Sequence, residues 1–347
     1  MDFVERLRRA GMSEAVRIDA HLASEMDVQS WFEAGWRRRL LRRLLSHLPP
    51  RIAALAARLV HRARGLAVEG VFWGGVRRVA TDAQWQRLTL SSYVVLYYHR
   101  LQGDLKPGQE RLDVPPALFE RQLRLLNWLR FRALSPDELV AFHDGLLLTL
   151  PRRSYVVTAD DGFQDCVEPL IRHASIHPQF YVPSAEIGGR SWWAGDEPIV
   201  RWDDLRRMAK AGVAIGSHAH RHVALPELDD LAIHEELDAS MSTLVGGLPS
   251  SVPFLAYPHG RTDARVASAA RTAGFRLAFT TDPGRNGAGT DVMHLRRVGV
   301  KSWDSPASFL WKTLTGELLP QRWEARLIRR DPPKSRRPRP IPASGDA

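Results

Sequence analysis

The 347-residue sequence contains a single cysteine and no long hydrophobic run. Both shortages exclude certain classes of protein. One cysteine, Cys166, excludes an intrachain disulfide and gives no sign of an oxidising compartment. No stretch approaches the ~20 apolar residues of a transmembrane helix, and the first residues lack the hydrophobic segment of a signal peptide. We therefore expect a location in the cytoplasm or at the cytoplasmic face of the membrane, and export only if a leader precedes Met1.

Positive charge is concentrated at the two ends of the chain. Of the formal net charge of +10, residues 1–90 contribute +7 and residues 320–347 contribute +5, which leaves −2 for the middle. Residues 36–66 hold nine arginines and no acid, interleaved with leucines. Because Pro49 and Pro50 interrupt this segment, it predicts two short amphipathic helices rather than one. Basicity therefore belongs to the ends and not to the central domain.

Three interpretations of residues 36–66 stay open. The segment could form a solvated helical pair packed on the main domain. It could also lie on anionic lipid, because arginine-rich faces beside leucine and tryptophan suit that role. Nucleic-acid binding is the third, and no recognition motif supports it. The stretch 331–342 is too rich in proline and charge to bury anything, so we expect a disordered basic tail.

The middle of the chain alternates between short apolar runs and helical patterns. Such alternation is typical of a parallel α/β barrel or sheet. Expected helices include 116–128 and 232–245. The expected strands are 94–98, 155–158, 179–182, 213–216, 254–257 and 277–280.

Two adjacent carboxylates, Asp160 and Asp161, directly follow the expected strand 155–158 and precede Gly162. In α/β folds, chemistry collects at the carboxyl ends of strands, so this pair is a candidate site. An Asp-Asp-Gly turn that only ends the strand is the alternative.

Three histidines at alternate positions follow the expected strand 213–216. His218 and His222 are four residues apart, so a single helical turn would place both imidazoles on one face. Two imidazoles and one carboxylate are the protein ligands of many catalytic metal sites, which keep a further position open for water. Three histidines after one strand, with paired acids after another, are hard to explain as packing. We therefore predict a metal site.

Together these segments resemble the signature of the polysaccharide deacetylase family (NodB homology, carbohydrate esterase family 4). Its motifs correspond to Thr158–Gly162, to His218–His222 and to Phe254–Gly260, the last in the form found in the exopolysaccharide deacetylase branch. The resemblance extends over residues 91 to 312 and includes an opening strand that ends in Tyr-His at residues 98–99. Ala159 stands where the family has an aromatic residue, and the family's leucine-x-histidine motif is not plainly present.

The resemblance implies a distorted, incomplete (β/α) barrel for residues 89–315, preceded by a basic helical extension (1–88) and followed by a basic, proline-rich tail (316–347). It implies that Asp161, His218 and His222 hold a divalent cation. The ligand types favour Zn²⁺ and also suit Co²⁺, Ni²⁺ or Fe²⁺.

The resemblance also implies roles around the cation. Asp160 would be the general base and Arg297 would orient it. Protonation of the leaving amine would fall to His294, with a reprotonated Asp160 as the alternative. Substrate and oxyanion contacts would come from the turn formed by Tyr257, Pro258, His259 and Gly260.

The function we expect is metal-dependent removal of N-acetyl groups from N-acetylhexosamine units of a bacterial polysaccharide or lipid-linked glycan. An O-acetyl esterase would use the same site. A non-catalytic glycan-binding relative is the other alternative, although the intact Asp and His set argues against it. Peripheral contact with anionic membrane through residues 36–66 is a further expectation.

Overall fold

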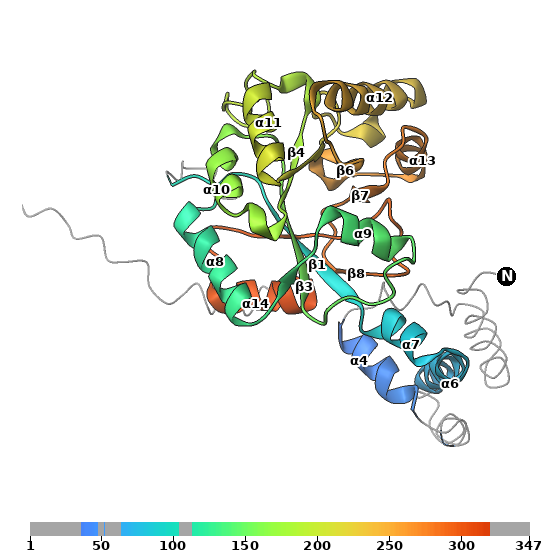
Figure 1. The fold of residues 1–347 in the computed structure, drawn as a ribbon. Helices are drawn as coiled ribbons and strands as arrows, with labels where there is room; N and C mark the ends of the chain where they lie inside the picture. The colour runs from blue at the N-terminus through green and yellow to red at the C-terminus, as the bar shows by residue number, and fades with distance from the viewer. Residues whose placement is uncertain (1–35, 48–51, 53–63, 104–112, 320–347) are drawn as a thin grey trace, which may run out of the picture.

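The computed structural model describes residues 36–47, 52, 64–103 and 113–319. The predicted tail from 320 onward and most of the segment between the two basic helices lie outside these residues. A single twisted sheet forms the centre of the chain, and helices surround it (Figure 1). Its main strands follow the spatial order β7-β6-β5-β4-β3-β1-β8. The bounds of the strands are β1 Ser92–Tyr98, β2 Arg132–Ala133, β3 Ser154–Ala159, β4 Gln179–Val182, β5 Ala214–Ser217, β6 Phe254–Ala256, β7 Leu277–Phe279, β8 Arg285–Gly287 and β9 Val298–Gly299.

The strands from β7 to β1 are parallel, so their carboxyl ends lie at the same rim. β8 pairs antiparallel with the first half of β1. Among the described residues, the gap between β7 and β1 is spanned by a bridge from Phe279 to Leu295 and by β9, which pairs with Leu96 and Tyr97. The sheet therefore curls into a distorted, incomplete barrel, as the family resemblance implied.

Side chains alternate along the strands between the inside and the outside of this barrel. Tyr93, Val156, Tyr181 and Phe254 belong to an inner cluster, which is closed by residues of α9 (Pro136–His143). Gly216 is required there, because a Cβ at this position would lie 2.6 Å from the ring of Tyr181.

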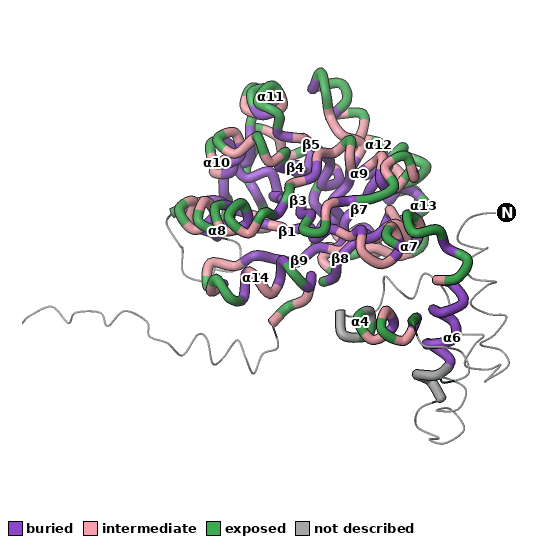
Figure 2. The backbone as a smooth tube through the Cα atoms, turned by 60° about the horizontal axis from the view of Figure 1, so that its bottom comes forward, coloured by how far each residue is buried: buried purple, intermediate pink, exposed green. Residues whose placement is uncertain are grey.

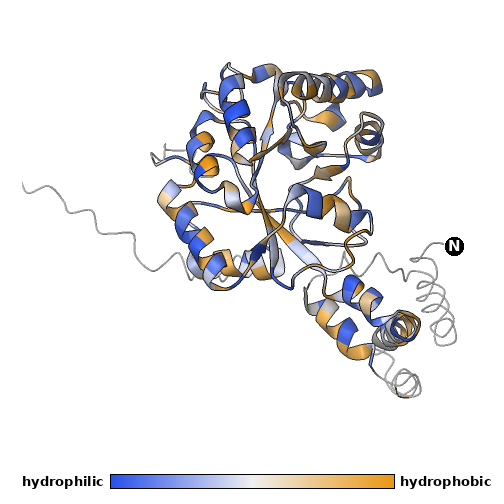
Figure 3. Cartoon of the chain, in the orientation of Figure 1, coloured by the Kyte–Doolittle hydropathy of each residue, from blue (hydrophilic) through white to orange (hydrophobic). Residues whose placement is uncertain are grey.

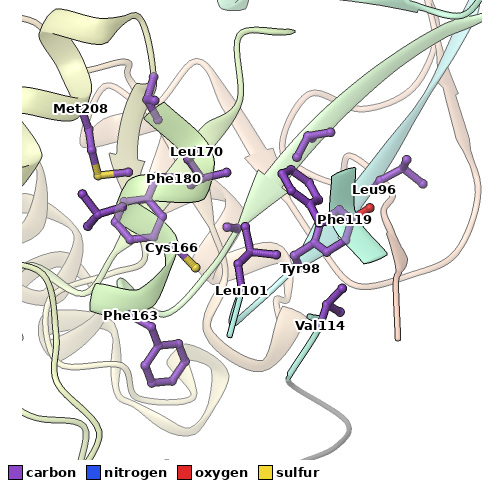
Figure 4. Close-up of a cluster of buried hydrophobic side chains, with 14 of the residues drawn as sticks. Leu96, Tyr98, Leu101, Val114, Phe119, Phe163, Cys166, Leu170, Phe180 and Met208 are labelled. Carbon is purple, nitrogen blue, oxygen red and sulfur yellow. The ribbon is translucent and has the colours of Figure 1, made fainter. Parts of the chain in front are cut away.

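The outward-facing side chains pack under the helices. Val94, Val157 and Phe180 lie in a second cluster with residues of α8, α10 and α11, and Figure 4 shows Cys166 buried within it. The strands of the sheet are buried, whereas the helices around the barrel also carry exposed residues (Figure 2). In Figure 3 these helices bear both hydrophilic and hydrophobic residues. The surrounding helices are α8 Pro116–Trp128, α10 Val167–Arg172, α11 Trp202–Ala211, α12 Asp230–Gly247, α13 Ala264–Thr272 and α14 Pro306–Thr315.

The N-terminal helices lie apart from the barrel, beyond α7 (Asp82–Thr89), which leads into β1 (Figure 1). α4 (Trp36–Leu45) packs against α6 (Arg64–Val79). Glu69 of α6 accepts hydrogen bonds from Arg38 at 2.6 Å and from Arg42 at 3.1 Å, and Arg42 lies over the ring of Trp73. Arg38 and Arg42, two of the nine arginines in residues 36–66, therefore have partners within the protein.

α14 is fixed to the barrel by a buried ion pair. The Lys312 ammonium donates to both carboxylate oxygens of Asp304, at 2.7 and 2.6 Å, and to the carbonyl of Gly299 at 2.9 Å. The same carboxylate accepts from the Ser308 hydroxyl at 2.7 Å and from the Lys301 amide at 2.8 Å. Both charged side chains are almost fully buried.

Candidate metal centre and active site

The acidic pair follows β3 directly, at the carboxyl rim of the barrel. Asp160 continues the strand, because its amide donates to the carbonyl of Tyr98. Asp161 and Gly162 then turn the chain with left-handed φ angles of 71° each. A Cβ on Gly162 would lie 2.9 Å from Val182, so the turn needs glycine for both shape and space. The reversal points the two neighbouring carboxylates to different partners.

The histidines follow β5, but they do not form the helical turn that we predicted. The segment from His218 to His222 is a loop in which Ala219 and His222 have φ angles of 60° and 56°. Carbonyls of the loop bond to another segment: Ala219 accepts from the Ser184 amide and His220 from the Ala185 amide. The spacing of four still brings both imidazoles together, by a different backbone path.

A buried glutamate of α12 accepts hydrogen bonds from the backbone of this loop. The Glu236 carboxylate accepts the amides of His220 and Arg221 at 3.1 and 2.9 Å, and it also pairs with the Arg221 guanidinium. Its side chain is 0% exposed, whereas that of Arg221 is 57% exposed. The sequence analysis gave Glu236 no role, and nothing in a helical pattern marks it.

Three potential ligand atoms converge at this place. Nε2 of His218 and Nε2 of His222 lie 3.1 and 3.2 Å from the same oxygen, Oδ1 of Asp161. The three residues are buried, and their ligand atoms all lie within 4.8 Å of one another. The structure therefore brings together the predicted ligand set.

Electrostatics keep the carboxylate of this triad charged. Burial alone would raise the pKa of Asp161, but the hydrogen bonds to His218 and His222 hold that pKa well below its usual range. The other nitrogen of His218, Nδ1, lies 2.6 Å from the carbonyl of Ala256. If Nδ1 carries the proton and donates it there, Nε2 presents a lone pair to Asp161.

These residues fit a divalent cation. Lone pairs on two imidazoles and on one carboxylate repel one another unless a proton or a cation lies between them. Buried histidine and carboxylate donors, with a backbone carbonyl fixing one imidazole, are the usual surroundings of a catalytic metal ion. Left-handed backbone at Asp161 and His222 adds to the case, because strain of this kind concentrates at functional sites.

Asp160 lies beside the triad with a different partner. Its Oδ1 accepts a hydrogen bond from Nη1 of Arg297 at 2.7 Å, and both side chains are almost fully buried. Arg297 is fixed in turn by the Thr280 carbonyl, the Thr158 hydroxyl and the ring of Tyr97. The structure thus places Arg297 against Asp160.

The turn at residues 257–260 follows β6 at the same rim. Tyr257 is buried, and its hydroxyl donates to the carbonyl of Met293, so its side chain points into the core. The amides of Tyr257 and Gly260 are both bonded, to Phe279 and to Tyr257 respectively, and Pro258 has none. His259 is exposed, and its ring lies 4.9 Å from that of His222. Its amide is the one in this turn for which we find no partner among the described residues.

His294, the predicted proton donor, contacts residues outside the metal centre. Its Nδ1 contacts Asp291 at 3.0 Å, and Asp291 also pairs with Arg271 of α13. We find no contact between His294 and Asp160 or Asp161 in the described part of the chain.

A different histidine, His99, lies near the acidic pair. It ends the β1 segment and packs edge-on against Tyr97. Burial lowers the pKa of His99, while the charges of Asp161 and Asp160 act to raise it. The sequence analysis assigned it no role, although its place at the end of a parallel strand was a usable signal.

Known proteins resemble this chain in sequence and in fold. Residues 148–278 match the family model described as polysaccharide deacetylase. YxkH of Bacillus subtilis strain 168, which is named as a polysaccharide deacetylase, is 23% identical over 222 residues, covering 62% of this chain and 74% of YxkH.

Two solved structures share the fold. IcaB from Ammonifex degensii has a TM-score of 0.57 at 24% identity, over 65% of this chain and 97% of that one. The Streptococcus pyogenes deacetylase PplD, solved in complex with acetate, has a TM-score of 0.57 at 20% identity, over 65% and 99% of the respective chains. The family match contains Asp160, Asp161, His218 and His222 within its bounds. Residues 148–278, which contain the buried Asp-His-His triad, thus match the polysaccharide deacetylase family of hydrolases.

Proposed function

We propose that the protein removes N-acetyl groups from N-acetylhexosamine units of a bacterial polysaccharide or a lipid-linked glycan. The observation that carries this proposal is the division of labour between two adjacent carboxylates. Asp161 faces two imidazoles, whereas Asp160 faces Arg297. A ligand set and a separate base side by side are what amide hydrolysis requires.

In this proposal Asp160 takes the proton of the attacking water. A divalent cation bound to Asp161, His218 and His222 would lower the pKa of water and polarise the acetyl carbonyl. Arg297 fixes the position of Asp160 through their 2.7 Å hydrogen bond and keeps its carboxylate off the triad. The His259 amide is the donor we assign to the oxyanion, since the other amides of its turn are already bonded.

Two histidines are candidates for the proton donor to the leaving amine. His294 is the one expected from the sequence. His99 directly follows Tyr98, which pairs with Ala159 just before the acidic pair. Comparing His99→Gln with His294→Gln separates them. We expect His99→Gln to reduce kcat by about 10²-fold or more, the range of general acid catalysis, and His294→Gln to change it little. The reverse pattern would assign the role to His294.

The proposed activity is tested by acetate release from a panel of N-acetylglucosamine polymers and lipid-linked sugars, with matched O-acetylated glycans. Release from the N-acetylated members supports the proposal. Release only from the O-acetylated members identifies an esterase that uses the same site. Metal analysis of the purified protein tests the further proposal that the cation is Zn²⁺, and full activity with another ion alone would contradict it.

We also propose that residues 36–66 contact anionic membrane at its cytoplasmic face. Within the described residues no helix is long and apolar enough to cross a membrane. Leu40 and Leu44 on α4 are 51% and 62% exposed beside Arg38, which is a pattern that suits an interface. Replacing both leucines by serine should weaken sedimentation with phosphatidylserine vesicles. Equal sedimentation of both proteins would reject the contact.

A further inference from the structure

A tryptophan lies exposed next to the metal centre, on a hairpin that the proposed mechanism does not use. Trp192 is 63% exposed, and its ring centroid lies 6.5 Å from that of the ligand His222. Between them Trp193 stacks on His222 at 4.1 Å and meets Trp192 edge-on at 5.6 Å. Trp192 therefore presents an indole ring to solvent at the edge of the catalytic centre.

The hairpin that carries Trp192 is bonded to the acidic motif. The Val200 amide donates to the Gly162 carbonyl at 2.8 Å, and the Gln164 amide donates to the Pro198 carbonyl at 3.0 Å. Within the hairpin, Ser191 and Glu197 exchange hydrogen bonds. The Glu197 carboxylate also accepts a hydrogen bond of 3.1 Å from Arg100, the residue that follows His99 in the sequence. The position of Trp192 is thus fixed relative to Asp160, Asp161 and His99.

We propose that Trp192 is a sugar-binding platform, which stacks on the pyranose ring next to the one that loses its acetyl group. An exposed aromatic ring at the edge of a polar catalytic centre gains from covering an apolar face, and the C–H face of a hexopyranose is such a face. Because the Trp192 ring lies 6.5 Å from that of His222 and not against the triad itself, we assign it to the neighbouring sugar and not to the one that carries the acetyl group. The preferred substrate is accordingly an oligomer or polymer rather than a single sugar.

This inference rests on the proposed deacetylation, so its test measures binding as well as turnover. Trp192→Ala is compared with the wild type on an N-acetylglucosamine monomer and on β-1,4- and β-1,6-linked tetramers. We expect KM for the preferred tetramer to rise about tenfold, with kcat and the monomer's KM nearly unchanged. Trp192→Phe should recover most of the loss, because it keeps an aromatic face.

Trp128→Ala is the matched control. Trp128 is 77% exposed and is the last residue of α8, close in sequence to β2, which pairs with the opposite end of β3. This variant should leave both KM values unchanged. Equal KM values for Trp192→Ala and the wild type on every tetramer would overturn the inference, as would a similar rise for monomer and tetramer.

Binding of the same tetramers to Asp160→Asn, measured by calorimetry with and without Trp192→Ala, separates the two proposals. Weaker tetramer binding in the double variant supports the platform even if no acetate is released from any substrate. In that case only the proposed deacetylation fails. Equal binding overturns the platform and leaves the proposed deacetylation untouched.

Discussion

Two of the buried clusters of charged side chains in the described residues differ in how completely they are bonded. Near α14, the ammonium of Lys312 has three oxygen acceptors, and Asp304 is bonded by three donor groups. At the metal centre, one oxygen of Asp161 is shared by two imidazoles, and Nδ1 of the buried His222 has no partner that we find in the described residues. The charged groups near α14 find all their partners within the protein. Those at the metal centre need a proton or a cation between them.

This difference shows what distinguishes a structural charge cluster from a functional one. Burial and opposite charge are common to both, so neither property identifies a site. A complete set of hydrogen bonds compensates the desolvation of Lys312 and Asp304 and ties α14 to the barrel. At the metal centre the set of hydrogen bonds is incomplete, and the site lies where several strands end, so its side chains can still bind a ligand. The predictions below perturb either the surroundings of the metal centre or the ion pair near α14.

The largest effect is expected for Asp160→Asn. Asparagine keeps the shape and can still accept from Arg297, but it cannot take a proton from water. We expect kcat for deacetylation to fall by about 10²–10⁴-fold, with metal content unchanged. Turnover at the wild-type rate would remove Asp160 from the role of base.

Next in size is Lys312→Met, which should lower stability and leave the metal centre intact. Removing one member of a buried ion pair leaves the charge of Asp304 uncompensated, at a cost of about 3–5 kcal/mol in the free energy of unfolding. Urea denaturation measures the loss, and metal analysis of the folded protein checks the other cluster. The double variant with Asp304→Asn should recover part of the stability. A variant as stable as the wild type would contradict the structural role.

A smaller effect is expected for Glu236→Ala, which acts on the histidine loop from outside the triad. Loss of the acceptor for two loop amides should weaken metal affinity by about 10–100-fold, measured by competition with a chelator. Arg221→Ala is the control, because it removes only the exposed partner of the same carboxylate. Unchanged metal affinity in Glu236→Ala would show that the loop holds its shape without this glutamate.

Sequence and structure agree best where interactions between residues close in the sequence determine the secondary structure. The helix predicted at 116–128 and the strand at 179–182 are found with those bounds. Pro116 suits the first turn of a helix, because its missing N–H would have no partner there. That the acidic pair and the histidines meet also follows from the sequence, because parallel strands bring their carboxyl ends to one rim. The choice of Asp161 over Asp160 as the ligand came from the family resemblance.

Long-range contacts account for what the sequence could not show. The histidine loop is not helical, because left-handed Ala219 and His222 and the amides bonded to Glu236 bend it differently. No local pattern predicts that contact, since Glu236 lies more than a dozen residues away. The proximity of His99 to the acidic pair likewise depends on β1 pairing with β3.

Metal content measured together with acetate release, in the wild type and in His222→Ala, tests the central claim most directly. The claim is that the incomplete cluster of Asp161, His218 and His222 is a metal centre that drives deacetylation. It predicts about one divalent ion per chain in the wild type, consistent with one three-ligand site, and loss of both metal and acetate release in His222→Ala, with the fold retained. Full metal occupancy and undiminished acetate release in the variant would contradict it.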